Sequence, residues 1–495
     1  MCGLSAIINF HHVESRHRAR PADLCKMTNL VAHRGPDGEG FAFINQAGAA
    51  TTHKRPCNAS VSEIPGAQQE FFIGLGHRRL AIVELSDLGH QPMACGEGKY
   101  WIVYNGEIYN HVELANELKQ HGVRLAGHSD TEVLLNAFRL WGPDCLSRLN
   151  GMFSFVIVDQ ERRRIFAARD RFGIKPLYYW LSPNGLLAFA SEIKQFTALP
   201  GWSASANAQR TYDFLAWGAT DHTDETMFNG VMQLKPGEAV NLPFDRFAAT
   251  NSYAGGRLPA KFWYELSSHQ FDGDFTEATA KFKELFDASV QRRLRSDVPV
   301  GACLSGGLDS SSIVALIDSK LKAMNGHQIS TFSACSELPR LDERKWMDIV
   351  TQNTASQPHY VYPNVDQMLE DLPQIIWHQD EPFATTSIFA QWKVFQLVGQ
   401  SDVKVVLDGQ GADEQLAGYD TFFGIKLAGL LKNLKLGETV SEFRSIREER
   451  GYSSTTLMML LANSVLPEGL LDPLRKIGGR TSLKPDWIDM DRLNA

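Results

Sequence analysis

The second residue of the chain has a side chain suited to nucleophilic catalysis. Cys2 follows the initiator methionine, and removal of Met1 would leave a thiol and a free α-amine on one residue. An α-amine has an ordinary pKa of about 7.7–8.0, so it is partly neutral near pH 7 and can act as the base that a thiol needs. Because the thiolate is the reactive form, this pattern predicts an N-terminal nucleophile. The alternative is an ordinary small residue at position 2, and Cys2 alone does not decide between them.

Two glycine-containing loops in the second half of the chain suit a phosphate ligand. The stretch LSGGLDSSS at 304–312 lies between an apolar run and a helical pattern, so backbone N–H groups, hydroxyls and a helix start would face one anion. It is not a Walker loop, which needs Gly-x-x-x-x-Gly-Lys-Ser/Thr. A second loop, LDGQGADEQLAGY at 407–419, follows another apolar run. Because carboxylates are good Mg²⁺ ligands, we expect Asp309 and Asp413 to share one metal. The alternative is two tight turns with solvated acids.

The elements that must position these residues differ between the two halves. The first 200 residues contain many short β-branched and aromatic runs bounded by turn residues, which predicts an α+β layered domain. Two stretches have helical periodicity, and the second begins with a Ser-x-x-Glu capping box at Ser129. Strands are expected at 71–85, 100–109, 152–159, 164–170 and 186–192, and helices at 111–122 and 129–142.

From about residue 276, helices and apolar strands alternate, which predicts a parallel, doubly wound α/β sheet. Such sheets bind ligands at the carboxyl ends of their strands, where both glycine-containing loops would lie. Helices are expected at 276–294 and 308–324, and strands at 298–303, 328–335, 359–363 and 402–409. The turn-rich stretch between the halves predicts an inter-domain region with some structure of its own. The expected domains are therefore 2–205 and 276–495, joined by 206–275.

Composition excludes several classes of protein. The net charge of −8 carries no basic excess, so nucleic acid is not an expected partner. No window approaches 18 consecutive apolar residues, and the N-terminus lacks a signal-peptide pattern, so neither a membrane span nor secretion is expected. The seven cysteines are scattered and never form a CxxC pair. This pattern argues against a disulfide framework or a zinc site and predicts a cytoplasmic protein.

The stretch SGGLDSS, with GADE downstream, resembles the pyrophosphate loop of N-type ATP pyrophosphatases and, within them, asparagine synthetases and β-lactam synthetases. The resemblance implies an ATP pyrophosphatase fold that uses ATP and Mg²⁺ to convert a carboxylate into an acyl-adenylate, with release of pyrophosphate. It implies three groups of residues in the second half. ATP would be bound by Leu304, Ser305, Gly306, Gly307, Asp309, Ser310, Ser311, Ala334, Asp408 and Gly409; the acyl-adenylate site would include Gln410, Asp413 and Glu414; the metal would be held by Asp309 and Asp413.

Five stretches of the first half resemble, in order, the class II glutamine amidotransferase domain: AHRGPDGEG, GHRRLAIVEL, YNGEIYNH, GHSDTEVLL and ARDRFGIKPLYY. The resemblance covers about residues 2–200 and implies an N-terminal-nucleophile hydrolase with a four-layer αββα sandwich. ARDRFGIKPLYY is expected at the domain junction, where an ammonia channel would run. The implied roles are Cys2 as nucleophile, Asn105 and Gly106 as oxyanion hole, Arg79 and Asp130 as ligands of the glutamine α-carboxylate and α-amine, and Glu107, Leu80, Ile82 and Val83 as the rest of the pocket.

Other roles were weighed for some of these residues. Arg79 could form a surface salt bridge, and Asp130 could cap a helix, because it stands at a predicted helix start. His33, His77 and His90 are interpreted as structural, since the α-amine already supplies a base. In the loop HQDEPFATTS at 378–387, Asp380 and Glu381 could border the acyl-acceptor pocket or form a capped turn before a proline.

Together the halves predict glutamine-dependent amide synthesis, with aspartate as the default carboxylate and asparagine as product. The expected partners are small molecules, and a homodimer is possible. Three departures from the family pattern stand out. Gln410 occupies a position that is usually glutamate, and the stretch TFSACSELPRLDE at 331–343 lacks the usual Gly-Phe-Glu continuation. The family also continues beyond Ala495, so the chain is expected to be C-terminally truncated. The alternatives are an amidotransferase for another carboxylate, such as a sugar uronate or a peptide, and an inactive synthetase retained for binding.

Overall fold

The N-terminal half contains two antiparallel sheets that face each other. The computed structural model describes residues 1–10, 14, 17–55, 70–244, 256–323, 328–466 and 487–489. The first sheet has seven strands in the order β11-β9-β10-β1-β4-β2-β3, and the second has six in the order β13-β12-β8-β7-β6-β5. The strands of the first sheet are β1 (Gly3–Ile8), β2 (Gly38–Ile44), β3 (Ala50–Arg55), β4 (Ile73–Arg79), β9 (Tyr178–Leu181), β10 (Leu187–Ala190) and β11 (Val231–Gln233). Those of the second are β5 (Met93–Cys95), β6 (Tyr100–Ile108), β7 (Gly151–Asp159), β8 (Arg164–Arg169), β12 (Glu238–Pro243) and β13 (Lys261–Phe262).

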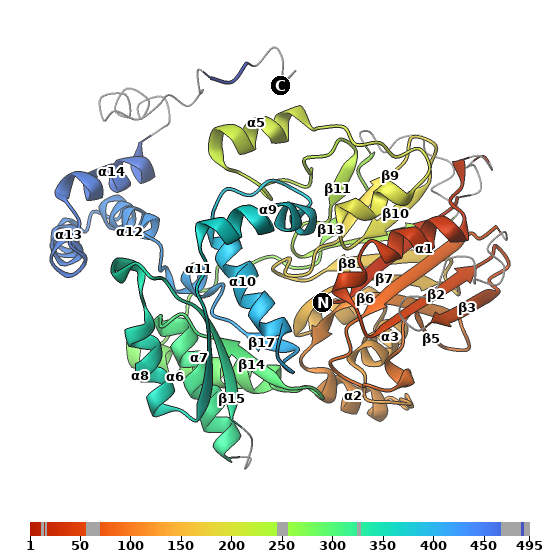
Figure 1. The fold of residues 1–495 in the computed structure, drawn as a ribbon, viewed down its shortest axis with the longest axis horizontal. Coiled ribbons are helices and arrows are strands. Elements are labelled where there is room, and N and C mark those ends of the chain that lie inside the picture. The colour runs from red at the N-terminus through yellow and green to blue at the C-terminus, as the bar shows by residue number, and fades with distance from the viewer. Residues whose placement is uncertain are drawn as a thin grey trace.

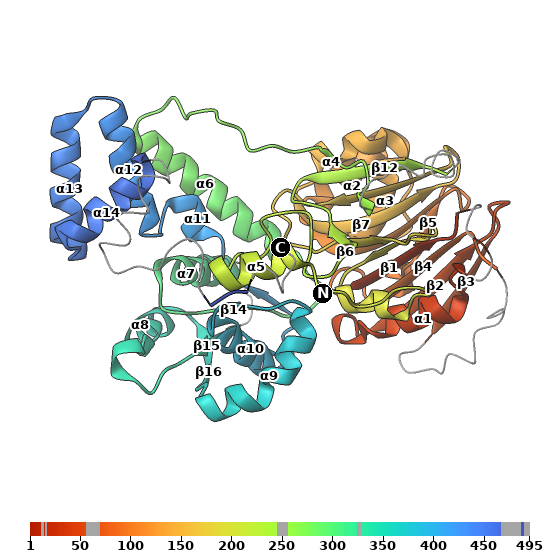
Figure 2. The same cartoon turned by 90° about the horizontal axis from the view of Figure 1, so that it is seen from above.

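Helices cover the outer faces of these sheets, so the half has four layers (Figures 1 and 2). Helix α1 (Pro21–Asn29) packs on β1 and β4, and α2 (His111–Gln120) and α3 (Asp130–Trp141) lie on the side of β6. Strand alternation explains the layers. In β6, Val103 joins the core between the sheets, whereas Ile102 and Tyr104 join the core beneath α2 and α3.

The predicted elements of this half are present, with two differences. The predicted strand at 71–85 ends at Arg79, because the chain leaves the sheet there, and Leu80, Ile82 and Val83 line a cavity described below. Ser129 caps α3 as predicted, since its hydroxyl accepts a hydrogen bond from the Thr131 N–H at 3.1 Å. The capping box is not formed, because the Glu132 carboxylate instead accepts hydrogen bonds from the N–H groups of Ala126 and Gly127.

The C-terminal half is built on a four-stranded parallel sheet with the order β16-β15-β14-β17. Helices α6, α7 and α8 contribute to the core on one face, and α10 packs on the other. Helices on both faces explain why the strands are short apolar runs. The strands are β14 (Val300–Cys303), β15 (Ile329–Ala334), β16 (Ser356–Val361) and β17 (Val405–Leu407). The helices are α6 (Phe275–Arg293), α7 (Leu308–Ala323), α8 (Arg344–Asn353), α9 (Val365–Gln379), α10 (Ser387–Gly399) and α11 (Ala412–Leu416).

Three further helices, α12 (Thr421–Lys432), α13 (Leu436–Arg450) and α14 (Ser454–Val465), form a separate small core beyond the parallel sheet (Figure 1). In the N-terminal half, a short helix, α4 (Cys145–Arg148), precedes β7. None of the helices in the described ranges has the length and apolar character needed to span a bilayer. Six cysteines are described, all as free thiols, and Cys57 lies outside the described residues.

Strands from the predicted inter-domain region 206–275 extend both antiparallel sheets. β11 pairs with β9, and β12 pairs with β8 and β13. The alternating burial of β12 shows why it fits the face of a sheet.

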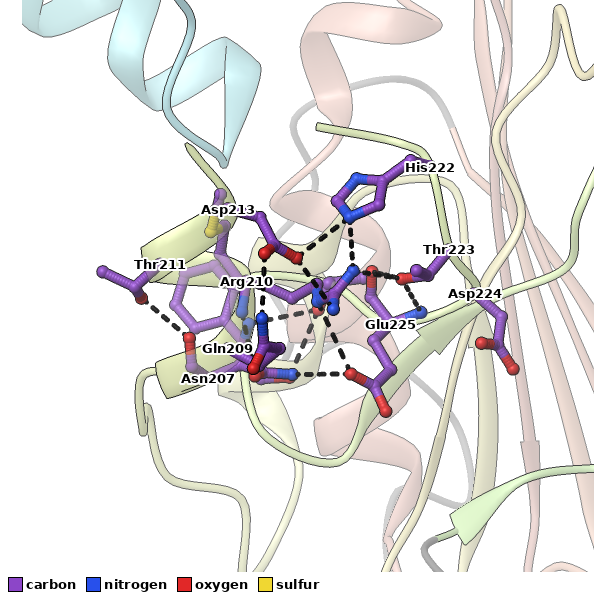
Figure 3. Close-up of polar contacts among 12 residues, drawn as sticks. Asn207, Gln209, Arg210, Thr211, Asp213, His222, Thr223, Asp224 and Glu225 are labelled. Carbon is purple, nitrogen blue, oxygen red and sulfur yellow. Dashed lines mark hydrogen bonds and ion pairs between the residues drawn. The ribbon is translucent and has the colours of Figure 1, made fainter. Parts of the chain in front are cut away.

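A helix from the same region, α5 (Ala208–Trp217), is tied to the loop after it by polar contacts around Arg210 (Figure 3). Its guanidinium donates to Thr223 Oγ1 at 3.0 Å and pairs with the carboxylate of Asp213 at 2.8 Å. The loop that leads into β11 is thereby held in place.

Candidate active site

Cys2 lies immediately before β1, at the junction of the two halves, where the chain begins in both views (Figures 1 and 2). Its Sγ accepts a hydrogen bond from the Leu80 N–H at 3.4 Å, and its carbonyl accepts one from Arg34 Nε at 2.9 Å. Burial raises the pKa of the Cys2 thiol. Since the thiolate is the nucleophile, a base must take the thiol proton before Cys2 can react.

A cavity of about 450 Å³ opens beside Cys2. It brings together every residue that the sequence predicted for the glutamine chemistry. The stretch after β4, the end of β6 and the start of α3 meet here, which explains why residues so distant in sequence share one space. Those lining residues are Cys2, Arg79, Leu80, Ile82, Val83, Asn105, Gly106, Glu107 and Asp130.

Asn105 and Gly106 stand near the end of β6, paired with Ser154 and Phe153 of β7. The side chain of Asn105 is fully buried, and neither its Oδ1 nor its Nδ2 has a hydrogen-bond partner among the described residues. A Cβ on Gly106 would lie only 2.3 Å from the carbonyl oxygen of Met152, so the close approach of these strands requires glycine. The Asn105 amide is therefore free to bind a ligand in the cavity.

The contacts of Arg79 and Asp130 are not those of a surface salt bridge and a helix cap, the simpler roles considered for them. Arg79 donates to backbone carbonyls, including that of Ser86 at 3.0 Å, rather than forming a surface ion pair among the described residues. Asp130 is the first residue of α3, but the cap is Ser129. The Asp130 carboxylate instead accepts hydrogen bonds from the Tyr104 hydroxyl at 2.8 Å and the Ile108 N–H at 3.0 Å. Burial raises its pKa.

Three titratable groups in the cavity have shifted pKa values: that of one acid is raised, and those of two amines are lowered. Burial and the nearby Asp130 charge raise the pKa of Glu107 to about 7. Burial and the Arg34 charge lower the pKa of Lys175 to about 8. Burial lowers the pKa of the N-terminal amine, carried here by Met1, to about 5. Lys175 had no role in the sequence analysis, although it lies within ARDRFGIKPLYY, and only the fold places it in this cavity.

The three histidines considered as bases have structural contacts. The ring of His77 is buried with Nε2 2.9 Å from the Tyr104 carbonyl oxygen, and burial lowers its pKa to about 3. Burial also lowers the pKa of His90 to about 4. His33 Nε2 lies 2.9 Å from a carboxylate oxygen of Glu192. His77 and His33 thus have partners within the fold, and the structural interpretation of the three histidines stays a prediction.

The glycine-containing loops of the second half meet at a second cavity of about 750 Å³. A Cβ on Gly409 would lie 3.2 Å from Asp309 Cβ, so the loops after β14 and β17 touch. Of the residues predicted for ATP and acyl-adenylate, the cavity is lined by Asp309, Asp408, Gly409 and Gln410. Ser305 and Ser310 hold the first loop closed, because the Ser305 N–H donates to Ser310 Oγ at 3.1 Å.

The remaining predicted residues of this half are not among those that line the second cavity. They are Leu304, Ser305, Gly306, Gly307, Ser310, Ser311, Ala334, Asp413 and Glu414. Asp413 turns toward Gly418, and Glu414 accepts a hydrogen bond from the Tyr419 hydroxyl at 2.8 Å. Among the described residues, no three His, Cys, Asp or Glu side chains are grouped as metal ligands. The cavity is lined by three carboxylates, Glu107 of the N-terminal half and Asp309 and Asp408 of the C-terminal half. Asp309 and Asp408 follow the neighbouring strands β14 and β17, and hard oxygen donors of this kind suit Mg²⁺.

The two cavities adjoin at the junction of the halves. Glu107, Met152, Val405, Val406 and Asp408 line both of them. The shared wall is therefore formed by the start of strand β7, by strand β17 and by one acid from each half.

Asp380 and Glu381 line neither cavity. They face the N-terminal half instead: Asp380 Oδ2 accepts from the Ile193 N–H and Glu381 Oε1 from the Met227 N–H, each at 2.7 Å.

Comparison with known proteins agrees with this arrangement. Residues 64–254 match the family model "Glutamine amidotransferase domain", and residues 281–471 match "Asparagine synthase". A Methanocaldococcus jannaschii protein described as a glutamine-hydrolysing asparagine synthetase is 32% identical over 440 residues, which cover 85% of this chain and 76% of the relative. The chain belongs to the glutamine-hydrolysing asparagine synthetase family.

Other members of the family differ in their named activity. Asparagine synthetase 1 of Bacillus subtilis is 30% identical, with 99% of this chain and 67% of the relative covered. Amidase chry2 of Gibberella zeae is 29% identical, with 85% of this chain but only 60% of the relative covered. The match to a solved B. subtilis glutamine phosphoribosylpyrophosphate amidotransferase covers 83% of this chain and 91% of that protein at 15% identity, with a TM-score of 0.38. Family membership thus implies an enzyme that uses glutamine and ATP without defining the acceptor.

Proposed function

We propose that this protein makes asparagine from aspartate with glutamine as nitrogen donor. Glutamine and water give glutamate and ammonia; aspartate and ATP give β-aspartyl-AMP and pyrophosphate; ammonia then displaces AMP. The observation that carries the proposal is that the predicted glutamine residues line one cavity, which adjoins a second cavity lined by Asp309 and Asp408.

In the first cavity, Cys2 attacks the side-chain amide carbon of glutamine, and a thioester forms as ammonia leaves. The unpartnered Asn105 amide and the Gly106 N–H stabilise the oxyanion, a contribution that is usually among the largest in such reactions. Arg79 binds the α-carboxylate, because a guanidinium fork matches its geometry. Asp130 and Glu107 bind the α-amine, and water then hydrolyses the thioester.

The base is the α-amine that Cys2 acquires when Met1 is removed. In the structure the N-terminal amine is that of Met1, which lines the cavity, and burial lowers the pKa of this amine to about 5. An amine in such surroundings is neutral at pH 7 and can accept the thiol proton. The raised pKa of the thiol makes this base necessary.

In the second cavity, the start of α7, where Leu308 and Asp309 line the cavity, receives the phosphates of ATP, as helix N-termini favour anions. Asp309 and Asp408 would hold Mg²⁺, which neutralises phosphate charge when bound. Asp408 is a better partner for Asp309 than the predicted Asp413, because it lines the same cavity. It also supplies the negative charge that Gln410 lacks. Ammonia passes along the shared wall, whose apolar part is formed by Met152, Val405 and Val406.

The proposal also covers the fold of each half and the compartment in which the protein acts. We infer that the four-layer half is an N-terminal-nucleophile hydrolase, that the parallel half is an ATP pyrophosphatase domain, and that the protein acts in the cytoplasm. Because β11, β12 and β13 belong to its sheets, the glutaminase unit runs to β13 rather than to residue 205.

A second candidate is an amidotransferase that acts on another carboxylate. Two observations favour it: Gln410, at a position that is usually glutamate in the family, lines the second cavity, and one relative is named an amidase.

The test is product analysis of the full chain with glutamine, ATP and aspartate. We expect glutamate, pyrophosphate and asparagine in the wild type. Cys2→Ala should abolish glutamate release and spare pyrophosphate release with ammonium as nitrogen source. Pyrophosphate that forms with another acid but not with aspartate would support the second candidate. Equal loss of both activities in Cys2→Ala would contradict the two-site scheme.

A further inference from the structure

A buried chain of ion pairs crosses the junction of the halves and ends at Cys2. Arg34 Nε donates to the Cys2 carbonyl at 2.9 Å, and Arg34 Nη1 donates to Glu192 Oε1 at 2.8 Å. The second oxygen of Glu192 pairs with Lys194. Lys194 Nζ then lies 3.0 Å from Asp380 Oδ1, which belongs to the C-terminal half. Four charged side chains thus connect the nucleophile to the loop between α9 and α10.

These side chains are poorly exposed to water. The exposed fractions are 9% for Arg34, 8% for Glu192, 4% for Lys194 and 9% for Asp380. Removing one partner from a buried pair is strongly unfavourable, because the other charge is left without compensation. Burial alone would raise the pKa of Glu192, but the hydrogen bond from His33 and the charges of Arg34 and Lys194 hold it well below its usual range. Movement of one member must therefore move its neighbours.

The end of α9 is held tightly against the N-terminal half. Asp380 terminates the helix with φ 63°, a left-handed conformation that costs a non-glycine residue energy. Its Oδ2 compensates by accepting hydrogen bonds from the N–H groups of Ile193 and Lys194. Beside it, the Trp377 ring lies 5.3 Å from Lys194 Nζ, and the His378 ring lies 4.6 Å from that of His33.

The loop that carries Asp380 continues into α10, which also reaches the glutamine cavity. Phe395 and Val398 of α10 line that cavity, while other residues of α10 pack on β15 and β16 of the parallel sheet. A displacement of the α9–α10 segment would therefore act at the nucleophile through the ion pairs and at the cavity wall through α10.

We propose that Asp380, through Lys194, Glu192 and Arg34, positions Cys2, so that glutamine hydrolysis depends on the docking of the C-terminal half. Asp380 is a positioning residue in this view, since it touches neither cavity. The inference rests on the proposed glutaminase activity. It predicts that a substitution in the synthetase half damages the glutaminase and leaves the synthetase chemistry intact.

The chain offers a matched control next to Asp380. Glu381 is also an acid that accepts a backbone hydrogen bond across the junction, from Met227, but it has no ion pair with the chain that leads to Cys2. This contact lies close to Arg210, because Arg210, Met227 and Glu381 line one small cavity. Asp380→Asn and Glu381→Gln each keep an acceptor oxygen for the backbone N–H and replace the carboxyl group with an uncharged amide.

The experiment compares these variants of the full chain in three assays: glutamate release, ammonium-dependent pyrophosphate release, and alkylation of Cys2 by a diazoketone analogue of glutamine. Asp380→Asn should lower the kcat of glutamine hydrolysis and the alkylation rate by about tenfold, a size typical of coupling between sites. Pyrophosphate release should stay within twofold of wild type, and Glu381→Gln should match wild type in all three assays.

A double variant tests the path. Lys194→Met should resemble Asp380→Asn, and the pair combined should be no worse than Lys194→Met alone, because both remove the same connection. The inference is overturned if Asp380→Asn hydrolyses glutamine within twofold of wild type, if pyrophosphate release falls in parallel, or if Glu381→Gln has the same defect. A wild type that releases no glutamate would instead overturn the proposed function.

Discussion

Replacing Asn105 with alanine separates catalysis from stability in this fold. Asn105 is fully buried in β6, and its amide has no hydrogen-bond partner among the described residues. A buried polar group without a partner costs about 1–3 kcal/mol, so its removal breaks no bond and relieves this cost. We therefore expect Asn105→Ala to unfold at the same denaturant concentration as wild type or at a higher one.

Catalysis should fall strongly in this variant, whereas its stability stays the same or rises. If the Asn105 amide donates to the oxyanion, its loss should lower the kcat of glutamine hydrolysis by about 10²–10³, which corresponds to about 2.7–4 kcal/mol. The KM for glutamine should change little, because the α-carboxylate and α-amine contacts remain. Glutamate release and urea-induced unfolding are the two measurements required.

Ser154 provides the matched control. It pairs directly with Asn105 across the two strands, it is equally buried, and its hydroxyl also has no partner among the described residues, yet it does not line the cavity. Ser154→Ala should leave glutamate release unchanged. The reasoning is refuted if Asn105→Ala keeps kcat within threefold of wild type, if its stability falls along with its activity, or if Ser154→Ala is equally impaired.

Two further predictions concern one acid in each half. Asp309→Ala should eliminate pyrophosphate release while glutamate release stays measurable; loss of both would show that the variant disturbs more than the ATP site. Because burial raises the pKa of Glu107 to about 7, its carboxylate loses its charge as the pH falls through that value. The KM for glutamine should therefore rise by up to about tenfold per pH unit below 7, and a Glu107→Gln variant with the same pH profile would exclude Glu107 as the cause.

Much of the candidate site could be predicted from the sequence because the residues lie in short local motifs. Cys2 is identified by its position, and Asn105, Gly106 and Glu107 are consecutive in one strand. The strands follow from β-branched and aromatic runs bounded by turn residues, and the start of α3 follows from Ser129, since strand propensity and helix capping are local effects. Local patterns were less reliable at the ends of elements. The strand predicted to reach residue 85 ends at Arg79, where lining the cavity takes the place of pairing in the sheet.

The tertiary structure alone decides how the two halves meet. Lys175 enters the glutamine cavity, Asp408 rather than Asp413 lines the second cavity with Asp309, and Asp380 pairs with Lys194. These contacts join residues up to hundreds of positions apart, and each side chain would be equally acceptable on a solvated surface. Local propensity determines which residues form a strand or a helix start, but burial and charge pairing depend on the packing of complete sheets and helices. The nucleophile is therefore recognisable in the sequence, whereas the ion pairs that hold it become visible only once the fold has buried them.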